Sequence, residues 1–123
     1  MYDKSLVQDI LNQILNATRT IQDRFVPINA VEDFTNTPAG MEKLDAICML
    51  VIAVGESLKN LDKITDKSLL VRYTNIDWKG AMGMRDIITH HYFDIDAEQI
   101  FWVCEHQMGP LTETIKQILT ENN

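Results

Sequence analysis

The apolar residues of this chain recur three or four residues apart, and this spacing constrains the fold more than any other feature. From Ser5 to Phe25 it places one continuous apolar stripe along a helix. The same spacing returns in three further segments, which begin near residues 38, 78 and 97. No segment alternates apolar and polar residues for long enough to indicate a strand. The chain is therefore predicted to be all-α, a bundle of four to five helices joined by short connections.

Residues suited to helix ends separate these segments. Residues typical of helix starts precede each one: Asp3 or Ser5, Thr37 with Pro38, Asp77, and Asp96 with Gln99. Pro27 ends the first helix, because proline lacks the backbone N–H that a helix interior needs. Gly109-Pro110 falls inside the last segment and is expected to kink or split that helix.

The length and composition suit one globular domain covering residues 1–123. Apolar residues make up 46% of the chain and charged residues 24%, which excludes a disordered or collagen-like protein. The longest apolar run, residues 47–54, is too short to cross a bilayer, and the N-terminal residues do not resemble a secretory signal. We therefore expect a cytoplasmic protein without membrane contact, in which Cys48 and Cys104 are buried free thiols rather than a disulfide.

The net charge of −7 argues against a non-specific nucleic-acid binder, which usually presents a basic face. The charge is uneven along the chain, however. Residues 63–92 hold three acidic side chains and five basic ones, so this window is positive: Lys63, Lys67, Arg72, Lys79 and Arg85. If any part of the protein binds a phosphate, we expect it to be this window.

The same window ends in a cluster of ionisable residues between Gly83 and Asp94. Asp86 and His90 are four residues apart, so they lie one helical turn from each other and the carboxylate can orient the imidazole. Arg85 and His90 are five residues apart, which separates them by about 140° around an ideal helix. They can converge if the long arginine side chain wraps around the helix, if the helix loosens near its end, or if two copies of the helix face each other in a dimer.

An arginine, a histidine and a tyrosine (Tyr92) around one cleft suit phosphodiester chemistry. Arg85 can bind a phosphate through two hydrogen bonds and stabilise charge in the transition state. Because histidine changes protonation near neutral pH, His90 can move the 2′-hydroxyl proton of RNA, and no metal is needed. The alternative is a solvated cluster or a helix cap without chemistry. Glu56 lies in an apolar helix and needs a partner, for which Arg85 is a candidate, but that pair could equally be a structural ion pair.

The other candidate residues give weaker indications of function. No metal or cofactor is expected, because the candidate ligands match no standard spacing: His90, His91, Asp94 and His106. Gly80 and Gly83 are expected to weaken the third helix and to mark the close approach of another helix or of a ligand. Trp78 and Trp102 are expected to anchor the core.

Taken together, these residues resemble a known family. Arg85-x4-His90-x-Tyr92 is similar to the R-x4-6-H signature of the HEPN superfamily. The wider set resembles the HepT-like toxins and runs in order along the chain: Gly55-Glu56, Ile76-Asp77-Trp78, Gly83-Met84-Arg85-Asp86, His90-x-Tyr92-Phe93 and Asp96. The resemblance extends from the first helix to about residue 115, nearly the whole chain.

The resemblance implies an all-α HEPN-type bundle that forms a homodimer, with the two R-x4-H helices lining a shared cleft. It implies a metal-independent endoribonuclease, in which Arg85 binds the scissile phosphate and His90 acts on the 2′-hydroxyl to leave a 2′,3′-cyclic phosphate. Asp86 and Glu56 would support this site. Tyr92 matches the tyrosine that a partner, the minimal nucleotidyltransferase antitoxin, adenylylates to silence the toxin. The family often has asparagine where Asp86 stands, so we expect weak, salt-sensitive RNA binding.

Two other functions are compatible with the same residues. The chain could be a non-catalytic nucleotide-binding subunit that regulates a nucleotidyltransferase, with Tyr92 as the acceptor, or a helical scaffold without a ligand. Nucleotide binding without RNA turnover would favour the regulatory subunit. In a dimer, we expect the contact surface to include Gly80, Met82, Gly83 and Met84.

Overall fold

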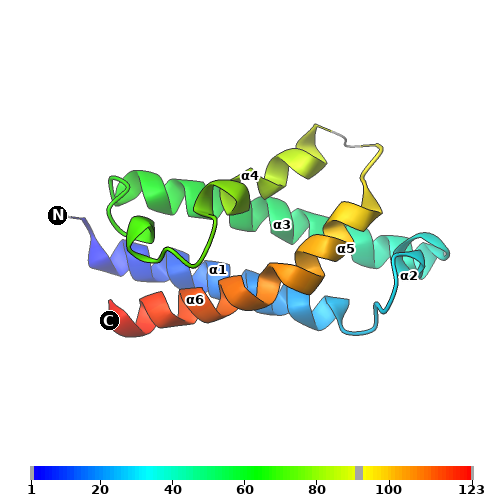
Figure 1. The fold of residues 1–123 in the computed structure, drawn as a ribbon, viewed down its shortest axis with the longest axis horizontal. Coiled ribbons are helices and arrows are strands. Elements are labelled where there is room, and N and C mark those ends of the chain that lie inside the picture. Colours follow the sequence, from blue (N-terminus) through cyan, green and yellow to red (C-terminus); the bar gives the residue numbers. More distant parts are fainter. Residues whose placement is uncertain (1, 91–92, 123) are drawn as a thin grey trace.

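The computed structural model of the chain describes residues 2–90 and 93–122, and it confirms the all-α architecture (Figure 1). The described residues form six α-helices and one 3-10 turn, without a strand. The elements are α1 (Lys4–Phe25), α2 (Glu32–Thr35), α3 (Pro38–Ile64), η1 (Leu70–Arg72), α4 (Trp78–Thr89), α5 (Ala97–His106) and α6 (Met108–Glu121). None of the described helices is long and apolar enough to span a membrane.

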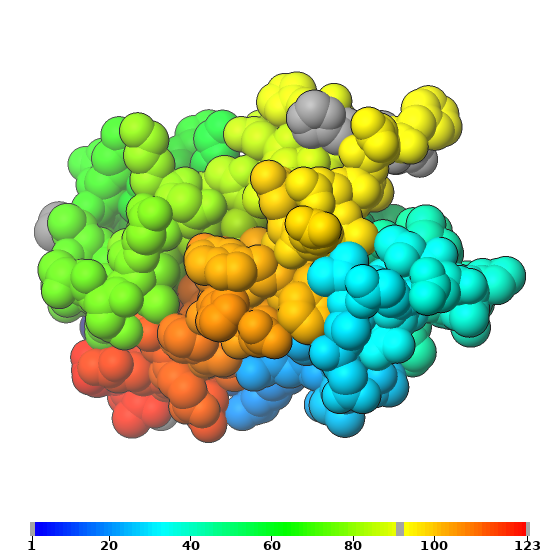
Figure 2. Space-filling view, turned by 45° about the vertical axis from the view of Figure 1, so that its right-hand side comes forward, coloured from blue at the N-terminus to red at the C-terminus, as the bar shows by residue number. Residues whose placement is uncertain are grey.

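The two longest helices, α1 and α3, form the centre of the bundle. α3 packs against both α1 and α4, and α6 runs along α1 (Figure 1). α5 lies on the surface between the 65–77 connection and residues 26–40 (Figure 2). The core draws fully buried side chains from α1, α3, α5 and α6, among them Leu11, Ile14, Ile47, Leu58, Ile100 and Ile115. This core holds α4 on one side of α3, where the site described below is formed.

The helix starts follow the predicted caps. Four side chains each accept a backbone hydrogen bond from the first turn of their helix: Asp3 in α1, Thr37 in α3, Asp77 in α4 and Asp96 in α5. Of the two candidates at the start of α1, Asp3 rather than Ser5 is the cap. Each cap satisfies a backbone N–H that the helix itself leaves without a partner. The Asp77 cap matters most for function, because it determines where α4 begins.

The predicted break in the last helix is a split into two helices. α5 ends at His106 and α6 begins at Met108, with Gln107 between them. Pro110 explains the position of the split. Its ring would clash with the carbonyl four residues earlier, which belongs to His106, and it has no N–H to donate to that carbonyl.

Two expectations about buried and exposed side chains are wrong. Trp102 does not anchor the core, because it is 53% exposed, whereas Trp78 is half-buried. Trp102 follows the buried Ile100 by two residues, which places it on the far side of α5 from the core. Met84 is not part of an exposed surface, because it is 2% exposed and lies on the same inward face of α4 as Ile88.

The two cysteines are buried free thiols, as predicted. Burial raises the pKa of Cys48 to about 12, with a smaller contribution from the nearby carboxylate of Asp45. Burial likewise raises the pKa of Cys104 to about 12, with a smaller contribution from Cys48. Both side chains therefore stay protonated at neutral pH and behave as small apolar groups in the core.

Candidate functional site

A glycine on α3 brings α4 close enough to place Arg85 beside that helix. A Cβ atom at Gly55 would lie 3.1 Å from the Met82 carbonyl oxygen and 3.5 Å from the Arg85 backbone nitrogen. Because glycine has no side chain, the two helix backbones can approach this closely. In the sequence, Gly55 is indicated only by the family resemblance. Its packing role depends on a contact with a residue 27 positions away in the chain, which no local pattern reveals.

The two glycines of α4 were expected to mark the close approach of another helix or of a ligand. The approach of another helix is wrong, and the approach of a ligand stays a prediction. A Cβ atom at Gly83 would meet no atom of another element within 4 Å, and the atoms nearest to one at Gly80 are those of the Asp77 carboxylate, in the cap of the same helix. The close approach between α3 and α4 occurs at Gly55 instead, and Gly40 of α3 lies close to the backbone of α2. The side of α4 at Gly83 is open.

Arg85 forms the predicted ion pair with Glu56. Its Nη1 lies 2.8 Å from the Glu56 Oε1, and its Nε lies 3.7 Å from the Asp86 Oδ1. The Arg85 side chain is 32% exposed and that of Glu56 is 56% exposed, so the pair is worth at most about 1 kcal/mol of stability. The two carboxylates orient the guanidinium, and its Nη2 group has no carboxylate partner among the described residues. Arg85 is thus held in place with donors available for an anion.

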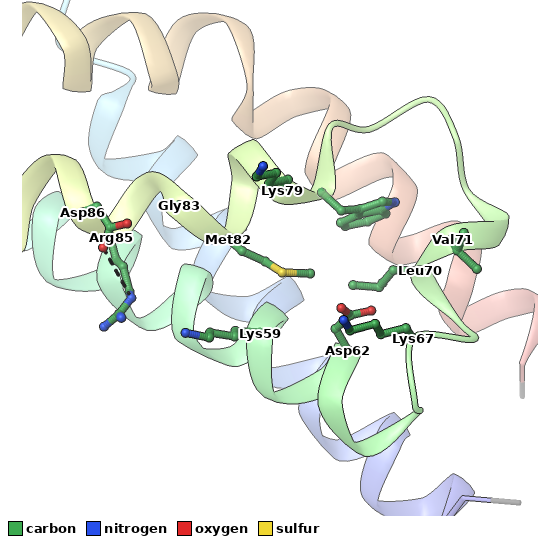
Figure 3. Close-up of a pocket in the computed structure, with 11 residues that line it drawn as sticks. Lys59, Asp62, Lys67, Leu70, Val71, Lys79, Met82, Gly83, Arg85 and Asp86 are labelled. Atoms are coloured by element: carbon green, nitrogen blue, oxygen red, sulfur yellow. Dashed lines mark ion pairs between the residues drawn. The ribbon is translucent and has the colours of Figure 1, made fainter.

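Arg85 and Asp86 lie at one end of a groove of about 600 Å³ between α4, the end of α3 and the 65–77 connection (Figure 3). Four of the eleven basic side chains of the protein line this groove, against two of its eighteen acidic ones. The lining cations are Lys59, Lys67, Lys79 and Arg85. Three of them belong to the window that the sequence analysis singled out, and Lys59 lies outside it. The groove is therefore a positively charged region on an acidic protein.

The far wall of the groove depends on a tight turn at the end of α3. Asp66 and Lys67 have φ values of 51° and 59°, in the left-handed region. The Asp66 N–H donates to the Lys63 carbonyl and the Lys67 N–H donates to the Asp62 carbonyl, which ends the helix in a Schellman motif. The turn reverses the chain and places Lys67 in the lining of the groove.

The connection that follows this turn is tied to the C-terminal helix. The Tyr73 hydroxyl donates to Glu121 Oε1 at 2.7 Å, and Arg72 Nη2 donates to Asn122 Oδ1 at 3.0 Å. The hydrogen bond from Tyr73 lowers the pKa of Glu121. Loss of water raises the pKa of Tyr73, and its bond to Glu121 raises it further. Leu70 is buried beneath the same segment, so the wall of the groove is firmly attached to the bundle.

His90 lies apart from the groove, at the end of α4. It is the exposed residue that follows the helix, and its backbone N–H donates to the Asp86 carbonyl at 3.4 Å. The Asp86 carboxylate pairs with Arg85, and in the described residues no ion pair joins it to His90. The structure thus brings Glu56, Arg85 and Asp86 together but does not bring His90 to them within one chain. Tyr92 and His91 lie outside the described residues.

The remaining expectations concern metals. Across residues 2–90 and 93–122, no group of three or more histidine, cysteine, aspartate or glutamate side chains is close enough together to hold a metal ion.

Comparison with known proteins shows the family to which the chain belongs. Residues 14–118 match the family described as Ribonuclease HepT-like. The chain is 28% identical to Putative RNase TTE0752 of Caldanaerobacter subterraneus subsp. tengcongensis over 109 residues, which cover 89% of this chain and 90% of that protein. It is also 28% identical to Putative RNase MJ0127 of Methanocaldococcus jannaschii over 95 residues, which cover 72% of this chain and 75% of that protein. No solved structure matches. The matched residues include all of α3 and α4, with Glu56, Arg85 and His90, and the chain therefore belongs to the HepT-like ribonuclease family.

Proposed function

We propose that this protein is a metal-independent endoribonuclease whose 2′-hydroxyl chemistry leaves a 2′,3′-cyclic phosphate, and that it acts in the cytoplasm as the toxin of a toxin–antitoxin system. The observation that carries the proposal is Arg85, which Glu56 and Asp86 orient at the end of a positively charged groove. Membership of a ribonuclease family supports RNA as the substrate.

In this proposal Arg85 binds the phosphate at which the chain is cut. Its free guanidinium donors hydrogen-bond to the non-bridging oxygens, which gain negative charge in the transition state. Glu56 and Asp86 act through Arg85 by keeping the guanidinium in place. Their negative charges also weaken phosphate binding, which fits a site that binds the transition state better than it binds the RNA.

His90 takes the proton from the 2′-hydroxyl in the first step. The 2′-oxygen then forms a bond to phosphorus, and the bond from phosphorus to the 5′-oxygen breaks. The leaving 5′-oxygen takes a proton from water, His90 gives up its proton to the solvent, and the upstream fragment keeps the cyclic phosphate. The exposed position of His90 at the end of α4 leaves room for the RNA at its imidazole.

A homodimer completes the site in this proposal. Arg85 and His90 lie about 140° apart around α4, and His90 does not line the groove that holds Arg85. A second copy that packs against α4 would bring its own α4 beside the first, so that Arg85 of one copy and His90 of the other share one cleft. Gly83 also borders a second hollow on the side of α4 toward α5, together with Gly80 and Trp102, which leaves room for such a contact outside the groove.

Mixing two inactive variants tests the shared cleft. Arg85→Ala and His90→Ala proteins are expected to be inactive alone and to regain activity when they exchange subunits, because one of the two clefts in a mixed dimer is then intact. A monomeric mass by light scattering at micromolar concentration, or no recovery on mixing, would contradict the shared cleft.

The partner in this proposal is a minimal nucleotidyltransferase antitoxin that adenylylates Tyr92. The added AMP would place a bulky negative group beside a site that binds phosphate, and RNA would be repelled. Co-expression with a minimal nucleotidyltransferase from the same organism is expected to add the mass of AMP to the peptide that contains Tyr92. Modification of Tyr92→Phe protein at an equal level would contradict this assignment.

Cleavage of RNA in excess EDTA tests the activity itself. We expect protein produced without a partner to cut RNA, to leave cyclic phosphate ends and to lose about 10²–10⁴-fold of its rate in His90→Ala. Replacement of the exposed His106 by alanine is the matched control, because His106 lies on α5 away from the groove, and it should not change the rate. Tight nucleotide binding by a folded protein that cuts no RNA would favour the non-catalytic regulatory subunit instead.

A further inference from the structure

We propose that the groove beside Arg85 holds a single strand of RNA next to the bond that is cut, and that Lys59, Lys67 and Lys79 bind its flanking phosphates. The inference rests on the proposed function, because Arg85 at the end of the same groove would hold the scissile phosphate. The three lysines and the preference for single-stranded RNA are not part of the R-x4-H motif.

The three lysines reach the groove from three different elements. Figure 3 shows Lys59 on α3, Lys79 on α4 and Lys67 on the connection that follows α3. All three are exposed, and among the described residues none of them forms an ion pair or a side-chain hydrogen bond. By contrast, Arg85 is engaged by carboxylates. Asp62 and Asp86 also line the groove, so its four cations leave a net positive charge of two, which suits the phosphates of a nucleic-acid strand.

The groove is long enough for more than one nucleotide. Lys79 and Arg85 are six residues apart on α4, which corresponds to about 9 Å along the helix axis. Phosphates of one B-DNA strand follow each other at about 3.4 Å along the helix axis, and those of a strand with unstacked bases lie farther apart. The two ends of the groove thus suit different phosphates of one strand, and a strand that enters at Arg85 continues past the lysines.

The floor of the groove favours unpaired bases. Met82, Leu70 and Trp78 line it, together with Val71, which is 64% exposed. The Trp78 Nε1 donates to the Tyr73 carbonyl at 2.8 Å, which fixes the indole ring. Apolar and aromatic side chains bind the faces of unstacked bases, and in a duplex those faces are covered by neighbouring bases. The groove therefore suits single-stranded RNA.

Binding by two triple variants tests the assignment of the lysines. In a His90→Ala background, which prevents cleavage, one variant replaces Lys59, Lys67 and Lys79 with glutamine. The other replaces Lys4, Lys43 and Lys116, which lie outside the groove and change the net charge equally. We expect the groove variant to bind a single-stranded RNA oligonucleotide at least tenfold more weakly, and its plot of log Kd against log salt to be shallower by about 2. Equal losses in the two variants would overturn the proposal.

Cleavage of substrates of different length separates this inference from the proposed function. In the protein with His90 intact, the groove variant should lose at least tenfold more kcat/KM on an oligonucleotide than on a dinucleotide with one phosphate. The same loss on both substrates would show that the lysines do not hold flanking phosphates. If the unmodified protein cuts neither substrate, the proposed function fails, whereas the binding comparison still decides whether the groove holds RNA.

Two further measurements test whether the groove prefers single-stranded RNA and whether RNA or a second copy of the chain fills it. In Trp102→Phe protein, Trp78 is the remaining tryptophan, and its fluorescence should be quenched by single-stranded RNA but not by a duplex of the same sequence. Equal quenching by both would overturn the strand preference. A lower molecular mass of the groove variant by light scattering would show that a second copy of the chain fills the groove, and it would overturn the proposal.

Discussion

The two sides of α4 have very different surroundings. On the side that faces α3, a methyl group at Gly55 would come within 3.1 Å of the Met82 carbonyl, whereas a methyl group at Gly83 would meet no atom of another element within 4 Å. Glycine within a helix therefore has two different structural roles in this protein. At Gly55 it permits a contact that positions Arg85, and at Gly83 it leaves an open surface that a partner can approach. Gly55 is therefore needed to build the site, whereas Gly83 belongs to a surface that is available to bind a partner.

Replacing Arg85 should produce the largest effect on activity with little effect on stability. We expect Arg85→Ala to lower kcat about 10²–10³-fold, because the transition state loses a charged hydrogen-bond donor. The free energy of unfolding should fall by less than about 1 kcal/mol, because the Glu56 ion pair is exposed. Cleavage assays and urea unfolding measure the two quantities. A large loss of stability with little loss of activity would make the ion pair merely structural.

A methyl group on the packed side should destabilise the protein. We expect Gly55→Ala to cost about 1–3 kcal/mol by overpacking against the α4 backbone, offset by about 1 kcal/mol from better helix propensity. The net result is a lower midpoint of urea unfolding and slower cleavage, because Arg85 moves with α4. Unchanged stability and activity would show that the close approach at Gly55 does not position the site.

The same change on the open side of α4 should stabilise the protein instead of destabilising it. We expect Gly83→Ala to raise the free energy of unfolding by about 1 kcal/mol, because alanine favours the helix and the methyl group meets no neighbour. Urea unfolding at several protein concentrations measures this gain. Weaker self-association in the variant would assign Gly83 to the contact between two copies.

The buried thiols provide a sensitive readout of the same comparison. Cys48 and Cys104 should react with a thiol reagent only when the bundle opens, so Gly55→Ala should speed labelling by about fivefold and Gly83→Ala should slow it similarly. Because folding raises the thiol pKa from 9.0 to about 12, the stability from these groups is present at neutral pH and is lost as the pH rises above 9. Fast labelling at neutral pH would contradict their burial.

Local chemistry explains how much of this fold was predictable. Capping at Asp77 and Asp96 and the break before Pro110 depend on residues within four positions of one another, and each prediction is confirmed. The predicted Glu56–Arg85 pair is also confirmed, but the reason given for it is wrong, because the Glu56 side chain is 56% exposed and does not require a partner.

Features that depend on distant residues were not predictable. The role of Gly55 requires knowledge of which helix lies against it. Lys59 joins the groove from outside the positively charged window, because the 65–77 connection folds back over the end of α3. The exposure of Trp102 also depends on how α5 is oriented toward the core. The hydrophobic character of tryptophan alone predicted that Trp102 would be buried, which is wrong.

The left-handed turn at Lys67 has an evolutionary consequence. A non-glycine residue in this conformation costs about 1–2 kcal/mol relative to the right-handed helix, and glycine avoids most of that cost. Selection for thermal stability alone would therefore choose glycine at this position and remove one of the cations of the groove. Under the proposed use of the groove, lysine at position 67 keeps a cation in the groove at the expense of stability, whereas Asp66, in the same left-handed conformation, bears a similar cost without lining the groove.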